Sequence, residues 1–274
     1  MTVLDKISEA VAFIRRIHPP ALRVGIVLGS GLGNFRKEIN VEQEIPYGQI
    51  PHFPVSTVEG HGGSLLLGTV GSVPVAAMAG RFHFYEGYSA EEVVFPIRVM
   101  KHLGVETLLV SNAAGGVNPG FSVGDLMVIT DHISFATVNP LLGKNLPELG
   151  PRFPDMSQPY GKELIRMAEE IAAGQGLTLR KGVYFGVTGP TFETRAEYRM
   201  INLLGGDAVG MSTVQEVIAA VHMGMSVFAV SIITDMGIRE EDNVITHAEV
   251  LEAAAAAEPK LAALFSSLIG KIAG

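Results

Sequence analysis

The chain has 274 residues, of which 47% are hydrophobic, enough apolar content for a large packed core. Its 20 Lys and Arg residues against 28 Asp and Glu residues give a net charge of −8 without a basic cluster, which argues against a nucleic-acid surface and favours a small-molecule partner. The absence of cysteine excludes disulfides, thiolate catalysis and cysteine-ligated zinc.

The first residues predict an amphipathic helix and not a signal peptide, because charged side chains interrupt the apolar ones. The apolar residues recur at helical spacing: Leu4, Ile7, Val11 and Ile14. The longest apolar stretch, Val217 to Ile233, is broken by polar residues and a glycine. We interpret it as a helix end, a turn and a buried strand, and therefore expect no membrane span.

Short runs rich in β-branched residues predict eight buried strands. Several of them are continuously apolar, as expected of strands covered on both faces in an α/β protein. They are Val24–Leu28, Ser64–Leu67, Val73–Met78, Thr107–Asn112, Leu126–Thr130, Gly182–Val187, Asp207–Val209 and Val227–Ile233.

Four helix starts are indicated by capping boxes, in which a hydroxyl residue is followed three positions later by Glu or Gln. These pairs are Ser89 and Glu92, Thr194 and Glu197, Ser212 and Gln215, and Thr246 and Glu249. Helices are predicted near Glu91–His102, Lys162–Ala173, Arg195–Leu204, Thr213–Met223 and His247–Leu268. Pro259 should kink the last helix or split it in two.

The alternation of strands and helices predicts a single α/β domain over residues 1–274, with a central mixed twisted β-sheet flanked by helices on both faces. No shift in composition marks a linker. In such folds the ligand crevice lies at the carboxyl ends of the strands. Functional residues are therefore expected directly after the strands.

Two strand ends carry groups suited to an anion. Gly-Ser-Gly-Leu-Gly follows Val24–Leu28, where glycines permit close backbone approach and Ser30 adds a hydroxyl. The run matches neither the dinucleotide fingerprint nor the Walker pattern, and an ordinary turn would look the same. After Val73–Met78 come Arg81 and His83, which point the same way in an extended segment and suit one oxyanion. The alternative is a loop with a surface arginine.

Two more strand ends extend this set. The small residues after Asn112 would expose backbone amides, Ala113 among them, although a tight turn has the same composition. Ser212 lies at a predicted helix N-terminus, where partial positive charge favours an anion, and it can also simply cap that helix. A phosphate-sized set of donors results: Ser30, Arg81, His83, the Ala113 amide and Ser212. A positioned phosphate dianion would stabilise an oxocarbenium-like state at a sugar anomeric carbon and attack it.

Five motifs, in family order between about Val24 and Leu251, resemble the trimeric purine nucleoside phosphorylases. They are Gly-Ser-Gly-Leu-Gly, Gly-Arg-Phe-His-Phe-Tyr-Glu-Gly-Tyr, Asn-Ala-Ala-Gly-Gly, Gly-Pro-Thr-Phe-Glu-Thr and Val-Gly-Met-Ser-Thr-Val. The resemblance implies the nucleoside phosphorylase fold and phosphate-dependent cleavage of purine nucleosides or deoxynucleosides to base and (deoxy)ribose 1-phosphate. It further implies a cytoplasmic homotrimer that uses inorganic phosphate as co-substrate and needs no cofactor or metal.

The resemblance also implies roles for individual residues. Phosphate would be bound by Ser30, His61, Arg81, His83, Ala113 and Ser212. Ribose would be bound by Tyr85, Met211, His247 and, from the neighbouring subunit, Phe153. The base would be bound by Phe192, Glu193 and Asp235, and the catalytic candidates are His83, Glu193 and Asp235.

Asp235 departs from the family pattern, because members specific for 6-oxopurines generally carry Asn there. An ionised carboxylate only accepts hydrogen bonds and so favours the 6-amino group of adenine, whereas a protonated one could donate to N7. We hypothesise a broadened preference that includes adenosine; inosine and guanosine could equally remain the best substrates. The segment 237–245, a lid over the base, also differs from the family.

Three alternatives stay open. A methylthioadenosine phosphorylase shares the fold and favours an aspartate near the base, but such relatives lack a histidine at the position of His247. A non-catalytic nucleoside-binding protein should have lost phosphate donors. A Rossmann dehydrogenase is opposed by the glycine pattern after Val24–Leu28.

Overall fold

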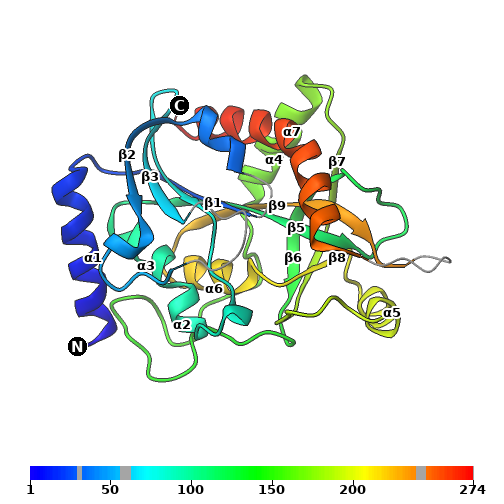
Figure 1. Cartoon of the computed structure of the whole chain (residues 1–274), viewed down its shortest axis with the longest axis horizontal. Coiled ribbons are helices and arrows are strands. Elements are labelled where there is room, and N and C mark those ends of the chain that lie inside the picture. The colour runs from blue at the N-terminus through cyan, green and yellow to red at the C-terminus, as the bar shows by residue number, and fades with distance from the viewer. Residues whose placement is uncertain (30–32, 56–62, 239–244, 274) are drawn as a thin grey trace.

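The computed structural model describes residues 1–29, 33–55, 63–238 and 245–273 (Figure 1). Within these ranges nine strands form one mixed sheet in the order β2-β3-β4-β1-β5-β8-β7-β6-β9. The strands are β1 Val24–Leu28, β2 Asn40–Pro46, β3 Ser64–Val70, β4 Val73–Ala79, β5 Thr107–Gly116, β6 Leu126–Ile133, β7 Leu179–Gly186, β8 Ala208–Gly210 and β9 Ser226–Met236.

The long strand β5 joins two parts of the sheet. On one side β5 runs parallel to β1, which continues through parallel β4 to the antiparallel strands β3 and β2. On the other side β5 runs parallel to β9, and β9, β6, β7 and β8 lead back to β5. Five strands therefore close on themselves. The mixed α/β sheet confirms the predicted fold class, but the sequence did not predict this closure.

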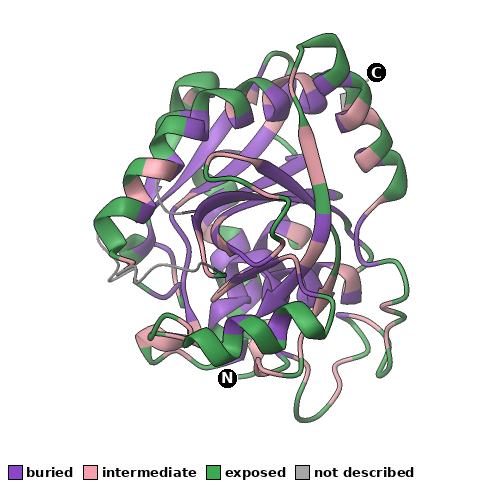
Figure 2. Cartoon of the chain, turned by 90° about the vertical axis from the view of Figure 1, so that its right-hand side faces the viewer, coloured by how far each residue is buried: buried purple, intermediate pink, exposed green. Residues whose placement is uncertain are grey.

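Helices cover both faces of the sheet, as predicted. One core cluster packs α1 Val3–Ile17, α3 Phe95–His102 and α6 Val214–His222 on one face. A second packs α4 Lys162–Gly174 and α7 His247–Ala273 on the other. Figure 2 shows the buried strands between these helices, whose outer faces are exposed. The remaining helices are α2 Ala90–Val93, α5 Arg195–Leu203 and the 3-10 turns η1 Gly33–Glu38, η2 Tyr47–Gln49 and η3 Phe84–Glu86.

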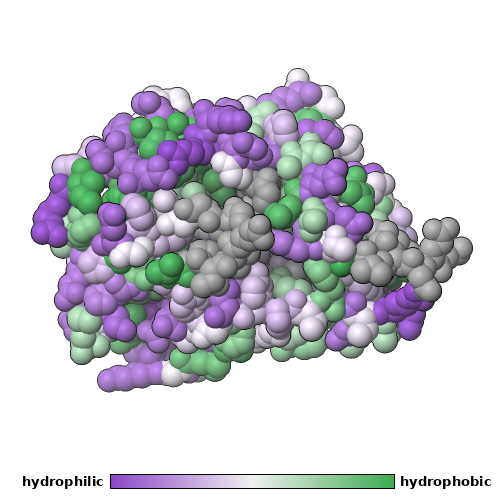
Figure 3. All heavy atoms as spheres, viewed as in Figure 1, coloured by the Kyte–Doolittle hydropathy of each residue, from purple (hydrophilic) through white to green (hydrophobic). Residues whose placement is uncertain are grey.

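The outer surface carries mainly polar side chains. On the face seen in Figure 3, hydrophilic residues predominate and apolar ones occur in small groups. In the part of the chain that the structure describes, no helix combines the length and apolarity that crossing a membrane requires.

Several element boundaries differ from the prediction. Strand β2 was missed because only Ile45 in it is buried, so it has no apolar run. The strand predicted to end at Asn112 is longer, since β5 continues through residues 113–116, and the alternative of a tight turn there is wrong. The single helix predicted at Glu91–His102 is two, α2 and α3, with Pro96 in the first turn of the second, where a missing N–H is tolerated.

Helices α6 and α7 differ in how well they match the prediction. The Ser212 capping box is wrong: α6 has Thr213 at its N-cap without a side-chain cap, and Gln215 donates to the Val138 carbonyl. Pro259 was predicted to kink or split the last helix. Helix α7 is continuous through Pro259, and Figure 1 shows its orange and red halves running in different directions, as expected of the kink and not of the split. The other three capping boxes are confirmed.

Candidate active site

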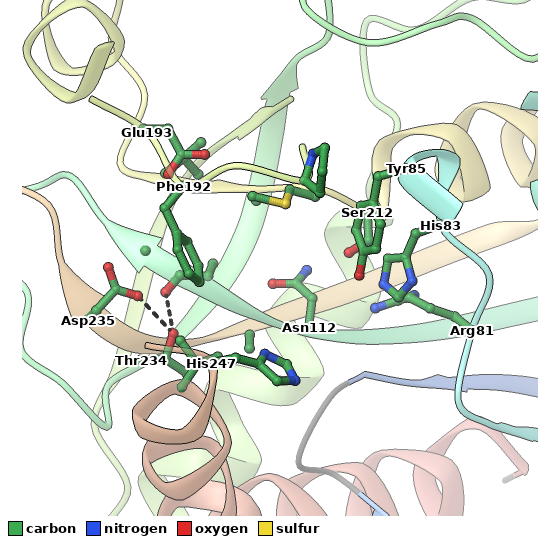
Figure 4. Close-up of a pocket in the computed structure, with 18 of the residues that line it drawn as sticks. Arg81, His83, Tyr85, Asn112, Phe192, Glu193, Ser212, Thr234, Asp235 and His247 are labelled. Carbon is green, nitrogen blue, oxygen red and sulfur yellow. Dashed lines mark hydrogen bonds between the residues drawn. The ribbon is translucent and has the colours of Figure 1, made fainter. Parts of the chain in front are cut away.

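One cavity of about 370 Å³ collects most of the predicted site residues at the strand ends. Figure 4 shows Arg81, His83, Tyr85 and Ser212 at one end and Phe192, Glu193 and Asp235 at the other, with Asn112 and His247 between. Ala113 and Met211 also line it. Phe153 does not, and Ser30 and His61 lie outside the described residues.

The cationic end is held by two buried carboxylates. Arg81, only 1% exposed, follows β4 and donates to Glu216 through Nε at 3.0 Å and through a terminal nitrogen at 2.9 Å. It also donates to the Ser111 carbonyl at 2.6 Å. His83 Nδ1 lies 3.0 Å from Glu86, and the His83 ring stacks on Tyr85 with centroids 4.6 Å apart. The carboxylates thus orient the Arg81 guanidinium and the His83 ring at the cavity wall.

Close approach of β1 and β5 shapes this end. A Cβ on Gly29 would lie 2.8 Å from the Ser111 carbonyl oxygen and 3.3 Å from the Arg81 guanidinium. One edge of β5 pairs with β1 as far as Val110 and with β8 from Gly115 onward. Residues 112–114 lie between these two pairings and line the cavity. A glycine at position 29 is therefore required by the backbone of β5.

The turn before α6 has an unusual backbone. Thr213 adopts φ 70° and ψ −53°, and the Val214 N–H donates to the Ser212 carbonyl at 2.7 Å. This is a positive-φ γ-turn, which costs a β-branched residue about 1–3 kcal/mol. Such strain is concentrated at functional sites, and here it lies beside Ser212 in the cavity wall.

The opposite end is acidic. Burial raises the pKa of Glu193, the charges of Asp235 and Glu197 raise it further, and hydrogen bonds from its own backbone and from Tyr198 oppose the rise. Asp235, 8% exposed, accepts a hydrogen bond of 3.1 Å from the Thr234 hydroxyl. Two carboxyl groups with one raised pKa can accept hydrogen bonds from, and return protons to, a nitrogen heterocycle.

Gly115 leaves room beside these carboxyls. A Cβ there would lie 3.1 Å from Asp235 Oδ2 and 3.5 Å from the Tyr198 hydroxyl. Phe192 is 42% exposed at the same end, where a flat ring could pack against it. The space suits a planar ligand with polar edges.

His247 is the first residue of α7, and its exposed side chain reaches the cavity. The Thr246 backbone and hydroxyl both donate to Glu249 at 3.0 Å, which fixes the start of the helix. Phe153 is 87% exposed and lies beside Arg152 at a separate cavity. Its predicted place at a neighbour's site is compatible with that exposure.

Sequence reasoning overlooked several supporting residues. Asn112 and Thr234 line the cavity, Glu86 orients His83, and Glu216 orients Arg81. Asn112 and Glu86 stand inside two of the five motifs that resemble the family, and those motifs were the available signal. Glu216 lies 135 positions from Arg81, so only the fold brings the pair together. Among the described residues, no group of three or more His, Asp or Glu is arranged to hold a metal ion.

Comparison with known proteins gives a uniform result. Residues 23–270 match the family model described as the phosphorylase superfamily. The chain is 54% identical over 248 residues to purine nucleoside phosphorylase 1 of Bacillus subtilis, covering 90% of this chain and 92% of that protein. It is 46% identical over 257 residues to purine nucleoside phosphorylase of Rattus norvegicus, covering 91% and 89%.

Two solved structures from Schistosoma mansoni agree closely in shape. Isoform 2 of purine nucleoside phosphorylase, in complex with cytosine and ribose-1-phosphate, has a TM-score of 0.93 at 44% identity and covers 97% of this chain and 95% of its own. A purine nucleoside phosphorylase in complex with adenosine has a TM-score of 0.94 at 39% identity and covers 99% of both chains.

Proposed function

Because the chain belongs to the phosphorylase superfamily, among its purine nucleoside phosphorylases, we infer that it uses inorganic phosphate to split a purine nucleoside into free base and (deoxy)ribose 1-phosphate. The observation that carries this inference is the polarity of the cavity. Arg81 and Ser212 lie at one end and Glu193 and Asp235 at the other. One end suits an anion and the other a heterocycle that carries N–H groups.

The proposed reaction uses both ends at once. Phosphate bound by Arg81, His83, Ser212 and the Ala113 amide attacks the anomeric carbon as the glycosidic bond breaks. Its negative charge stabilises the oxocarbenium-like transition state, and the bonding electron pair departs with the purine. We assign Ser30 and His61 to the same phosphate. The reaction needs phosphate as a second substrate, and we propose no cofactor.

The remaining assignments follow the position of each residue. Tyr85, Met211 and His247 line the cavity, and we assign them to the ribose. At the acidic end, Glu193 accepts the N1 hydrogen of a 6-oxopurine and Phe192 packs on the base. Asp235 contacts the 6-substituent or N7, and we propose that adenosine is therefore a substrate beside inosine and guanosine. Release of base from inosine, with and without phosphate, tests the activity itself.

The acid limb of the pH profile should depend on Glu193. Its raised pKa means that Glu193 becomes protonated, and loses the charge that strengthens its hydrogen bond from N1–H, at a pH above the usual range of a glutamate. We expect kcat/KM for inosine to fall as the pH drops through that pKa. In Glu193→Gln the amide oxygen still accepts but does not titrate, so kcat/KM at pH 7 falls about 10- to 100-fold and the limb disappears. The titration of phosphate affects wild type and Glu193→Gln equally, so it cancels in the ratio of their two pH profiles. A ratio independent of pH would contradict the role assigned to Glu193.

Phe153 belongs, in this proposal, to the site of a neighbouring subunit in a homotrimer. Its ring is 87% exposed and lies outside the candidate active-site cavity of its own chain. We expect Phe153→Ala to raise KM for the nucleoside about tenfold without a change in thermal stability. Mixing Phe153→Ala with Glu193→Ala subunits should restore activity, since the second variant supplies Phe153 to the intact cavity of the first. No recovery in verified mixed trimers would contradict the shared site.

The relatives' names favour this activity over the methylthioadenosine enzyme, the silent binder and the dehydrogenase. A cytoplasmic location stays a prediction of the sequence.

A further inference from the structure

We propose that Thr213, held by Asn112, is a positioning residue that fixes the Ser212 hydroxyl as a hydrogen-bond donor to phosphate. The inference rests on the proposed function, since it assigns Ser212 to a phosphate site. It adds a residue that does not line the cavity and so would act only through another.

The hydrogen bonds around Thr213 indicate how the Ser212 hydroxyl is held. Thr213 is 1% exposed, and its Oγ1 lies 2.9 Å from Asn112 Nδ2 and 3.3 Å from Ser212 Oγ. Because Nδ2 can only donate, Thr213 Oγ1 accepts from Asn112. Accepting from Asn112 leaves the Thr213 hydrogen available to Ser212 Oγ, and we assign that direction to the pair. In this arrangement Ser212 accepts from Thr213, and its own hydrogen, which is also within reach of the Tyr184 hydroxyl, is available to an anion in the cavity.

The backbone of Thr213 is strained, at an energetic cost that glycine would avoid. Thr213 has positive φ in the γ-turn closed by Val214, a conformation that glycine adopts without penalty. The turn places Oγ1 between Asn112 and Ser212. The Tyr184 hydroxyl, itself buried, accepts from the Ser212 N–H at 3.4 Å and restrains the same residue from the other side. The strained residue is thus tied to the site by its hydroxyl.

Asn112 connects Thr213 and Ser212 to the cavity in which the ligand would bind. It is 2% exposed in β5 and lines the cavity, and Figure 4 shows its amide midway between the two ends. Within the described residues its Oδ1 has no hydrogen-bond partner. A buried acceptor of this kind is costly until a hydroxyl reaches it, and both ribose and monohydrogen phosphate carry O–H groups. Asn112 therefore contacts ligand through Oδ1 while Nδ2 holds Thr213.

The test uses Thr213→Val, which keeps the shape and β-branching but removes the hydroxyl. We expect KM for phosphate to rise about tenfold while KM for inosine stays within about twofold. Thr213→Ser, which keeps the hydroxyl, should stay within about threefold of wild type. Thr107→Val, a buried threonine at the far end of β5, is the matched control and should leave both constants unchanged.

A double-mutant cycle isolates the route. If Thr213 acts through Ser212, Thr213→Val should have no further effect on phosphate KM in a Ser212→Ala background. Additive effects of Thr213→Val and Ser212→Ala on phosphate KM, or equal effects of Thr213→Val and Thr213→Ser, would overturn the proposal that Thr213 acts through Ser212. If the valine variant does not fold, Thr213→Ala is carried through the same cycle, with phosphate binding also measured by thermal shift. A folded wild type without phosphate-dependent base release would instead refute the proposed function.

Discussion

Replacement of Arg81 by methionine is expected to lower kcat/KM for phosphate by about 1,000-fold, because it removes the preorganised positive charge that lines the proposed phosphate end of the cavity. The same change removes the partner of Glu216, which lies buried against Arg81 at 2.9 Å. Leaving that carboxylate buried without its cation should destabilise the fold by about 3–5 kcal/mol. Thermal melting and steady-state kinetics with varied phosphate measure the two effects.

The double variant Arg81→Met with Glu216→Leu separates stability from catalysis. Exchange of a buried ion pair for apolar side chains of similar size is often neutral or stabilising. The melting temperature should therefore recover most of the loss while the phosphate defect persists. A single Arg81→Met variant that keeps activity within tenfold of wild type would contradict the placement of phosphate at this end.

Replacement of Asp235 by asparagine is expected to lower the ratio of kcat/KM for adenosine to that for inosine about 10- to 100-fold. The ionised carboxylate accepts from the 6-amino group of adenine, whereas an amide can donate to O6 and N7 of a 6-oxopurine. KM for phosphate should change little, because Asp235 lies at the other end of the cavity from Arg81. An unchanged ratio would contradict the role of Asp235 in base selection.

The same variant makes a second, independent readout available. The charge of Asp235 is one cause of the raised pKa of Glu193. With a neutral side chain at position 235 that pKa should fall, and the acid limb of kcat/KM for inosine should move to lower pH. If the acid limb of the pH profile does not move, Glu193 and Asp235 do not interact across the base site.

Local patterns allowed much of the fold to be predicted. Strands with continuous apolar runs, such as Val24–Leu28, were found with both ends correct, because burial on two faces leaves a composition that is hard to mistake. Strand β2 was missed because it carries mostly exposed polar residues. The closure of β5 through β8 and β9 depends on pairings between distant segments, and no local periodicity encodes them.

The candidate site, like the fold, was predicted only in part. Residues at strand ends, such as Arg81 and Asp235, were found from motif and position, and the cavity brings them together. Glu216 and Thr213 were not, since one acts through a contact far along the chain and the other through its backbone angle. Side chains that hold the site in place are visible only once the fold is known.

The central claim is tested most directly by following base release from inosine, guanosine and adenosine, each with and without inorganic phosphate. We expect release that depends on phosphate, with ribose 1-phosphate formed in equal amount, and adenine release measurable beside that of hypoxanthine. Folded protein that releases no base from any of the three nucleosides, or that releases it equally without phosphate, would contradict the account.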